Sequence, residues 1–218
     1  MAKNIAIFDL DRTLTKGGSF SPFLISIARE EPDKRLYIFA VMFQMLLYLI
    51  KRRTRKTLKE YMLRSFMTGM SKNQTSKYSK AFLKRLQERG KFFESGLEAI
   101  KAHKKKGDMV VIATASMDFY VEDIAKKLGA DHIIATTSVW RRGIIEPMIK
   151  GENCYGAEKA KRVQAFLAGR TVGRVWFYSD HHTDAPTFAL ADFRVAVNPT
   201  TKLRQIAKDN GYDIQNWK

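Results

Sequence analysis

The chain has 218 residues, 45% of them hydrophobic and 28% charged, which is typical of a globular protein and excludes a disordered or fibrous one. This length suits one domain or a core with a subdomain. The single cysteine, Cys154, excludes an internal disulfide framework and is typical of a packed residue in a reducing compartment. The formal net charge is +17, and residues 16–91 hold 18 basic and 5 acidic residues, a local excess that favours anionic partners.

The first predicted element is a buried strand. Residues 4–8 form a short apolar run that is rich in β-branched and aromatic side chains, as is typical of a parallel strand. No signal peptide precedes this run, so we expect a cytoplasmic protein. Asp9 and Asp11 follow directly, at the edge where open α/β sheets place their chemistry.

The next stretch, residues 19–90, has helical patterning throughout. We expect breaks near Pro32-Asp33 and at residues 69–71, where glycine and proline interrupt the pattern. Ser71 is the predicted N-cap of a helix that ends before Gly90. The sequence therefore predicts a helical insertion between the first and second strands.

Residues 36–50 are the most apolar segment of this insertion, and a basic cluster follows at residues 51–56. A helix of this length is short of the ~18–20 residues needed to cross a bilayer. One hypothesis is peripheral contact with an anionic membrane, at the inner membrane face, or an entry for a lipid chain. The alternative is a helix buried within the insertion or in a dimer contact.

The remainder of the chain alternates apolar runs with helical patterns. We expect strands over residues 109–114, 131–135, 174–178 and 192–197, helices over 94–106, 117–129, 156–168 and 200–210, and a hairpin over 138–149 with its turn at Arg142-Gly143. This alternation predicts an α/β fold, a Rossmann-like parallel sheet core with helices on both faces and a helical cap inserted after the first strand. The predicted core comprises residues 1–16 and 91–218, and the predicted cap comprises residues 17–90.

Two carboxylates at the end of the first strand carry the central hypothesis. Asp9 and Asp11 repel each other unless a cation or a shared proton compensates, so the pair predicts a divalent-metal site, with an acidic turn as the alternative. Asp180 and Asp184 follow a later predicted strand and provide the oxygen ligands that Mg²⁺ prefers.

Phosphate ligands are expected at two further positions. Thr114 and the adjacent backbone N–H groups, including that of Ala115, stand where a strand leads into a helix N-terminus, a favourable place for an anion. Lys159 lies in the first turn of a later predicted helix and can direct its ammonium at the same phosphate. Each signal is weak alone, since capping hydroxyls and solvated lysines are common.

Taken in order, these segments resemble the four motifs of the haloacid dehalogenase (HAD) superfamily. The motifs are Asp9-Leu-Asp11-Arg-Thr13, Thr114 at a strand end, Lys159, and Asp180 with Asp184. A helical insertion between the first and second motifs is similar to the phosphoserine-phosphatase-like branch, subfamily IB. The resemblance covers nearly the whole core.

The resemblance implies a Mg²⁺-dependent phosphatase that works through an aspartyl-phosphate. It assigns nucleophilic attack to Asp9 and acid/base chemistry to Asp11. It assigns Mg²⁺ to Asp9, the Asp11 carbonyl and Asp180, with Asp184 acting through water or by orienting Lys159, and it assigns phosphate binding to Thr114, Ala115 and Lys159.

The substrate is the point at which the sequence departs from the branch. Residues 16–24 lack the acidic residue that meets the amino group of phosphoserine, and residues 179–184 differ from the usual Gly-Asp-Gly-x-Asn-Asp. The basic, partly apolar insertion favours an amphiphilic phosphate of the phosphatidylglycerophosphate or lysophosphatidate type. The alternative is a soluble ester such as histidinol phosphate. A nucleic-acid-binding protein using residues 51–64 is the remote alternative, because no known reading motif is present.

Overall fold

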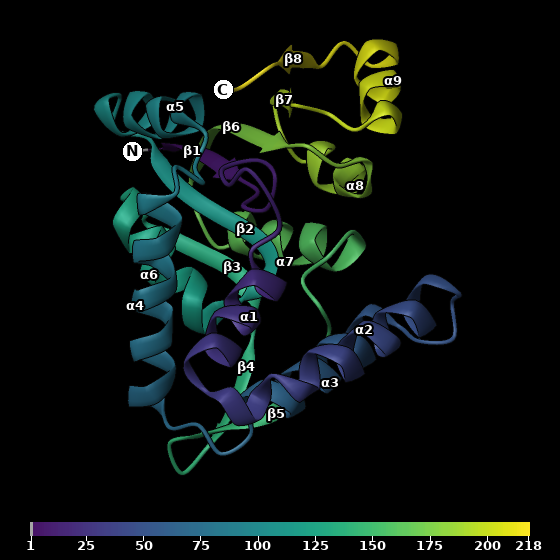
Figure 1. Cartoon of the computed structure of the whole chain (residues 1–218). Coiled ribbons are helices and arrows are strands. Elements are labelled where there is room, and N and C mark those ends of the chain that lie inside the picture. The colour runs from purple at the N-terminus through teal and green to yellow at the C-terminus, as the bar shows by residue number, and fades with distance from the viewer. Residues whose placement is uncertain (1) are drawn as a thin grey trace.

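The computed structural model describes residues 2–218. Its centre is a six-stranded parallel sheet in the order β3-β2-β1-β6-β7-β8 (Figure 1). The strands are β1 (Lys3–Phe8), β2 (Met109–Met117), β3 (His132–Thr136), β6 (Val172–Ser179), β7 (Phe193–Val197) and β8 (Asp213–Gln215). The predicted α/β fold is confirmed, and β8, which the apolar pattern did not indicate, adds a short edge strand.

Alternate side chains of the central strands pack into two separate cores. Ala6 and Phe8 of β1 belong to one apolar cluster, whereas Ile5 and Ile7 belong to the other. This alternation follows from the two-residue period of a strand. Both faces of the sheet are therefore buried, as parallel sheets require.

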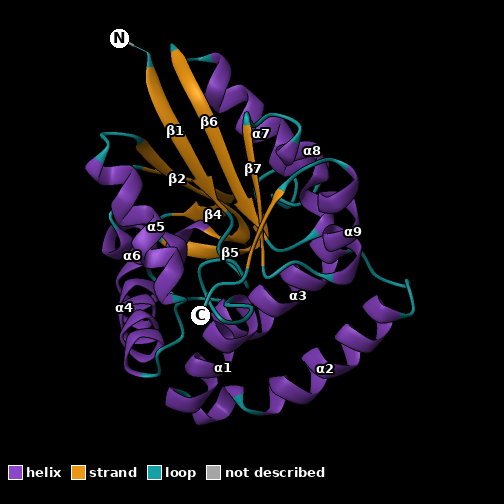
Figure 2. Cartoon of the chain, turned by 90° about the horizontal axis from the view of Figure 1, so that it is seen from above, coloured by secondary structure: helices purple, strands orange, loops and turns teal. Residues whose placement is uncertain are grey.

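Helices cover both faces, as predicted (Figure 2). The helices of the core are α5 (Glu94–Lys105), α6 (Asp118–Leu128), α7 (Ala157–Ala168), the short α8 (Ala185–Phe188) and α9 (Thr201–Asp209). Residues from α5 and α6 join the first cluster, and residues from α7, α8 and α9 join the second. The sheet thus lies between two helical layers.

The predicted insertion is helical but has one more break than expected. It contains α1 (Phe20–Glu30), a 3-10 turn (Pro32–Lys34), α2 (Leu36–Leu49), α3 (Arg55–Met67) and α4 (Lys72–Glu88). The additional break falls at residues 50–54, where Lys51 adopts a positive φ of 58°. Thr54 then caps α3, and Ser71 caps α4 as predicted.

Helix α2 lies at the outer edge of the molecule, alongside α3 (Figure 1). Val41 is its only buried residue. The alternative that this segment is buried within the insertion is therefore wrong. No helix within residues 2–218 is long and apolar enough to cross a membrane.

The predicted hairpin forms a small sheet of its own. Strands β4 (Ser138–Arg141) and β5 (Ile144–Ile149) are antiparallel, and Arg142 and Gly143 both have positive φ, as a tight two-residue hairpin turn requires. Strand β5 contacts α3. The hairpin therefore extends the helical insertion although it comes from the later part of the chain.

The two connections to the insertion run side by side. The N–H of Lys16 donates to the carbonyl of Lys91 at 2.8 Å, and Thr15 forms a β-bridge with Phe92. The division into a core (1–16 and 91–218) and a cap (17–90) stays a prediction, and this paired crossing lies at its proposed boundary.

Candidate active site

The strand order creates a switch point between β1 and β6. The chain proceeds from β1 to β2 and β3 on one side and continues through β6 and β7 on the other. Ligands bind at such points in open α/β sheets, beyond the carboxyl ends of the strands. Phe8 pairs with Tyr178, so Asp9 and Asp180 emerge close together at this edge.

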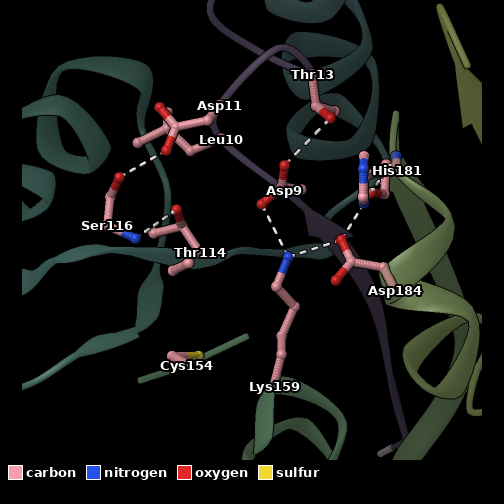
Figure 3. A network of polar contacts seen from close by, with 12 residues as sticks. Asp9, Leu10, Asp11, Thr13, Thr114, Ser116, Cys154, Lys159, His181 and Asp184 are labelled. Atoms are coloured by element: carbon pink, nitrogen blue, oxygen red, sulfur yellow. Dashed lines mark hydrogen bonds and ion pairs between the residues drawn. The ribbon is translucent and has the colours of Figure 1, made fainter. Parts of the chain in front are cut away.

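Lys159 joins two of the predicted acidic residues (Figure 3). Its ammonium lies 2.9 Å from Oδ1 of Asp9 and 2.7 Å from Oδ2 of Asp184, and all three side chains are buried. Ser179 also donates to Asp184, at 2.7 Å. The structure therefore brings residues that are 25 and 150 positions from Lys159 into one ion cluster.

Burial dominates the electrostatics of this cluster. Desolvation raises the pKa of Asp9 to about 7, against the opposing effect of Lys159. Desolvation and the neighbouring Asp184 raise the pKa of Asp180 to about 6. Burial by itself lowers the pKa of Lys159, but the carboxylates of Asp184 and Asp9 outweigh it and keep the ammonium charged. The site thus holds more negative charge than its one lysine neutralises.

Asp11 points away from this cluster, toward β2 (Figure 3). Ser116 donates to its Oδ2 and the backbone N–H of Ser19 donates to its Oδ1, both at 2.6 Å. The Ser19 hydroxyl in turn shares hydrogen bonds with Ser116 and Tyr120. Asp9 and Asp11 therefore have different surroundings, as two carboxylates with different tasks require.

The predicted phosphate ligands lie on β2. Thr114 is fully buried, and its hydroxyl accepts the N–H of Ser116 at 3.0 Å. Ala115 lines a cavity of about 300 Å³ that also contains Asp9, Lys159 and Asp180. We call this the catalytic cavity. Phosphate binding by Thr114 and Ala115 stays a prediction.

The insertion contributes a residue that sequence reasoning did not select for the site. Arg55 at the start of α3 lines the catalytic cavity, and its guanidinium stacks 3.9 Å from the ring centre of Tyr155. Tyr155 also lines this cavity. The basic cluster was noted in the sequence, but nothing in its spacing indicated which of its members faces the carboxylates.

Two lysines of α3 complete a contact with the core. Lys56 donates to the Gly151 carbonyl and pairs with Glu152. Lys59 donates to the Ala115 carbonyl and to Asn153. Burial lowers the pKa of Lys59 to about 8, although Asp11 opposes the shift. We call Arg55, Lys56 and Lys59 the α3 basic edge.

Three further residues, Cys154, His181 and His182, lie near the site. Cys154 is buried, and burial raises the pKa of its thiol to about 11, as suits a packed residue. His181 lines the catalytic cavity and contacts Thr183 through Nδ1 at 2.8 Å. His182 is partly buried, and its ring lies 4.3 Å from that of His181.

The donor set suits Mg²⁺. No hydrogen bond or ion pair within residues 2–218 joins the Asp180 carboxylate to another residue, although it is buried, and Oδ1 of Asp184 is buried without a partner in the same range. The described side chains form no cage of three acidic, histidine or cysteine ligands. Mg²⁺ does not need one, because it commonly takes one or two carboxylates with water and substrate phosphate.

Comparison with known proteins decides the family. The profile described as haloacid dehalogenase-like hydrolase matches residues 6–189. The chain belongs to this family. The match extends from β1 through α8 and so includes every acidic residue of the site and Lys159.

Curated relatives of the chain carry different names. Phosphoserine phosphatase SerB1 of Mycobacterium tuberculosis is 29% identical over 130 residues, which cover 59% of this chain and 42% of that protein. Histidinol-phosphatase of Neisseria meningitidis is 25% identical over 131 residues, covering 55% and 56%. The chain therefore matches only about half the length of these curated relatives.

A solved structure extends the similarity over the whole fold. A protein of unknown function from Bordetella pertussis Tohama I shares 26% identity, with a TM-score of 0.87 and 98% of each chain covered. Because the match covers nearly the whole chain, it includes both the sheet and the helical insertion.

Replacing Lys159 tests the buried ion cluster. In Lys159→Met the carboxylates of Asp9 and Asp184 lose their cation. We expect the free energy of unfolding at neutral pH to fall by about 3 kcal/mol, because uncompensated buried charge is costly. Urea denaturation measures this, with the exposed Lys161→Met as the control. Equal midpoints for the two variants would contradict the cluster.

Lys59 generates a pH prediction. Its folded-state pKa of about 8 lies below its ordinary value of 10.5. Between these two pH values the unfolded chain therefore binds more protons than the folded chain. The free energy of unfolding of wild type then rises with pH from about 8 to 10.5. Relative to Lys59→Met we expect a rise of about 2 kcal/mol, because solvent screens part of the effect of the pKa shift. Denaturation curves at several pH values measure the difference. Lys80→Met serves as the exposed control, and parallel curves for wild type and Lys59→Met would reject the shift.

Proposed function

We propose that the protein is a Mg²⁺-dependent phosphomonoester hydrolase that works through an aspartyl-phosphate. The observation that carries this proposal is the cluster of Asp9, Lys159 and Asp184 at the switch point, with Asp180 beside it and Asp11 held apart. It provides a nucleophile, a cation for phosphate oxygens and a separate acid/base group.

The first step forms a bond between an Asp9 oxygen and phosphorus while the bond from phosphorus to the ester oxygen breaks. Asp11 donates a proton to the departing alkoxide. In the second step Asp11 takes a proton from water, the water oxygen bonds to phosphorus, and the bond to Asp9 breaks. Free phosphate leaves, and both carboxylates return to their starting states.

Other residues of the chain support these steps. Lys159 already contacts Asp9 and would hold an equatorial oxygen of the bound phosphate, together with Thr114 and the N–H of Ala115. Asp9, the Asp11 carbonyl and Asp180 would hold Mg²⁺, with Asp184 reaching it through water. The ion would supply positive charge to the phosphoryl group. That charge would also offset the excess negative charge of the site.

We propose an amphiphilic phosphate as the substrate, because α2 presents an apolar face to solvent. The residues that are more than half exposed are Leu36, Phe39, Met42, Phe43, Leu46, Leu49 and Ile50. Their three- and four-residue spacing places them on one face. Lys51, Arg52 and Arg53 follow directly and are exposed. An apolar face beside cations suits the surface of an anionic bilayer.

A chain of contacts leads from the C-terminal turn of α2 to the site. Tyr48 of α2 accepts a hydrogen bond from Arg55 at 2.9 Å, and Arg55 stacks on Tyr155. Both Arg55 and Tyr155 line the catalytic cavity. A phosphate head group at the end of α2 would thus meet Arg55 close to the carboxylates, which supports a lipid-like ester over a purely soluble one.

A soluble ester is the second candidate. The relative named histidinol-phosphatase favours such a substrate, and the relative named phosphoserine phosphatase favours phosphoserine. Phosphoserine fits this chain less well, because residues 16–24 contain no acidic side chain to meet its amino group. A lipid-like substrate predicts that the protein binds vesicles, whereas a soluble ester predicts that it does not.

Substitution of the two aspartates tests the chemistry. We expect Asp9→Asn to lower release of p-nitrophenol from p-nitrophenyl phosphate about a thousandfold or more, and EDTA to have a similar effect on wild type. In Asp11→Asn the good leaving group departs unaided but water is not activated. Intact-mass measurement should then show one added phosphoryl group. The exposed Asp33→Asn is the control, and full activity in Asp9→Asn would reject the proposal.

Vesicles test the substrate class. We expect wild type to float with phosphatidylglycerol vesicles and to hydrolyse lysophosphatidate with a higher kcat/KM than histidinol phosphate. The double variant Phe39→Ser and Leu46→Ser should lose flotation and lose lysophosphatidate hydrolysis at least tenfold, while its activity on p-nitrophenyl phosphate is kept.

The matched control replaces two exposed apolar residues outside α2, Ile144→Ser and Met148→Ser. Absence of flotation, or preference for histidinol phosphate, would overturn the lipid proposal in favour of the soluble ester. Sedimentation showing that wild type is a dimer and the α2 variant a monomer would assign the apolar face to a second copy instead.

A further inference from the structure

A second cavity lies between α1 and α4, behind the loop that follows the catalytic aspartates. Its volume is about 370 Å³, and the loop residues that line it are Thr15 to Ser19. Gly18 is the one lining residue that it shares with the catalytic cavity. We call it the α1–α4 cavity. Its size falls within the range of small-molecule sites.

The rim of this cavity is basic. It is lined by Lys16, Arg29, Arg85, Arg89 and Lys91, and by no acidic residue. Arg85 pairs with Glu30 at 2.6 Å, whereas no ion pair within residues 2–218 involves the other four cations. Four cations without a carboxylate partner around one cavity attract an anion.

Arg85 adds an unmet hydrogen-bonding requirement. One of its terminal nitrogens binds Glu30, whereas Nη1 is buried and has no partner within residues 2–218. A buried donor without an acceptor is unfavourable by about 1–3 kcal/mol. Because Arg85 lines the cavity, a bound anion would offer the acceptor that this side chain lacks once the guanidinium turns toward it.

The rest of the lining is apolar. Pro22 and Ile25 of α1 face the cavity together with Phe82 and Leu86 of α4. Ile25 is 38% exposed, which is high for an isoleucine between two packed helices. An inorganic anion would leave this surface uncovered. The lining therefore suits an organic anion with a compact apolar part, such as an aromatic or branched group.

The wall of the cavity is connected to the catalytic acid/base residue. Ser19 lines the cavity, and its N–H holds Oδ1 of Asp11 at 2.6 Å. Its hydroxyl also contacts Ser116, which donates to the other oxygen of Asp11. A ligand that shifts Ser19 would therefore change one hydrogen bond to the Asp11 carboxylate directly and the other through Ser116 of β2.

We propose that the α1–α4 cavity binds a small amphiphilic organic anion and that its occupancy changes catalysis through Ser19 and Asp11. The binding part stands on the cavity alone, whereas the catalytic part rests on the proposed phosphatase function. The site is distinct from the substrate site because Asp9, Lys159 and Asp180 do not line it.

The test uses naphthalene-1-sulfonate as the probe, with binding measured by calorimetry on the full chain. We expect one site per chain in wild type and equally in Asp9→Asn, whose phosphatase chemistry is disabled. Arg89→Glu should weaken binding at least fivefold through charge, and Ile25→Asn at least threefold through loss of apolar contact. Lys80→Glu makes the same charge change on an exposed part of α4 outside the cavity and should bind like wild type.

Hydrolysis of p-nitrophenyl phosphate then reports the connection to Asp11. We expect saturating probe to change kcat at least twofold in wild type, and we expect the probe concentration that gives half of this change to be at least fivefold higher in Arg89→Glu. Equal probe affinity in wild type and Arg89→Glu, or no binding, would overturn the site. Binding that Arg89→Glu weakens, with kcat unaffected in wild type, would overturn the connection. If wild type hydrolyses no p-nitrophenyl phosphate even without probe, the phosphatase proposal is rejected. Calorimetry then still decides whether the α1–α4 cavity binds the probe.

Discussion

The buried ion cluster around Lys159 is the constraint on which the site depends. One ammonium neutralises Asp9 and Asp184, which come from the end of β1 and from the turn after β6. Charges buried to this degree persist only when they are paired and hydrogen-bonded. The start of α7 must therefore lie against the switch point of the sheet. The Asp180 carboxylate lies beside the cluster and has no hydrogen-bond or ion-pair partner within residues 2–218, so it leaves a negative excess that a metal ion and phosphate chemistry can use.

The strongly basic insertion complements this acidic edge. The α3 basic edge crosses to the core through Arg55 on Tyr155, Lys56 on Glu152 and Lys59 on the Ala115 carbonyl. Long cationic side chains can pack their aliphatic stems against the insertion while their charged ends reach polar groups of the core. Because the insertion is strongly basic, its helices cannot act as a purely apolar cover over the site. The same charge favours anions both at the catalytic cavity and at the α1–α4 cavity.

Much of the fold was predictable because its signals are local. Strands β2, β3, β6 and β7 were predicted from short apolar runs. The Ser71 cap and the Arg142-Gly143 turn were predicted from backbone preferences that act within a few residues. The break at residues 50–54 was missed, because a run of lysines and arginines has good helix propensity and the turn depends on α2 folding back on α3. Edge strand β8 was missed because three residues carry too little pattern.

The sequence by itself determined the α/β class, the inserted helices and the order of the acidic, hydroxyl and lysine motifs, since each depends on neighbours in the chain. Only the tertiary structure decided what these groups touch. It turned Asp11 toward Ser116 and Ser19, brought Lys59 of α3 to β2, and left the apolar face of α2 in solvent. These outcomes depend on how helices far apart in the sequence pack, and a side chain's partners are set by that packing rather than by the residues beside it.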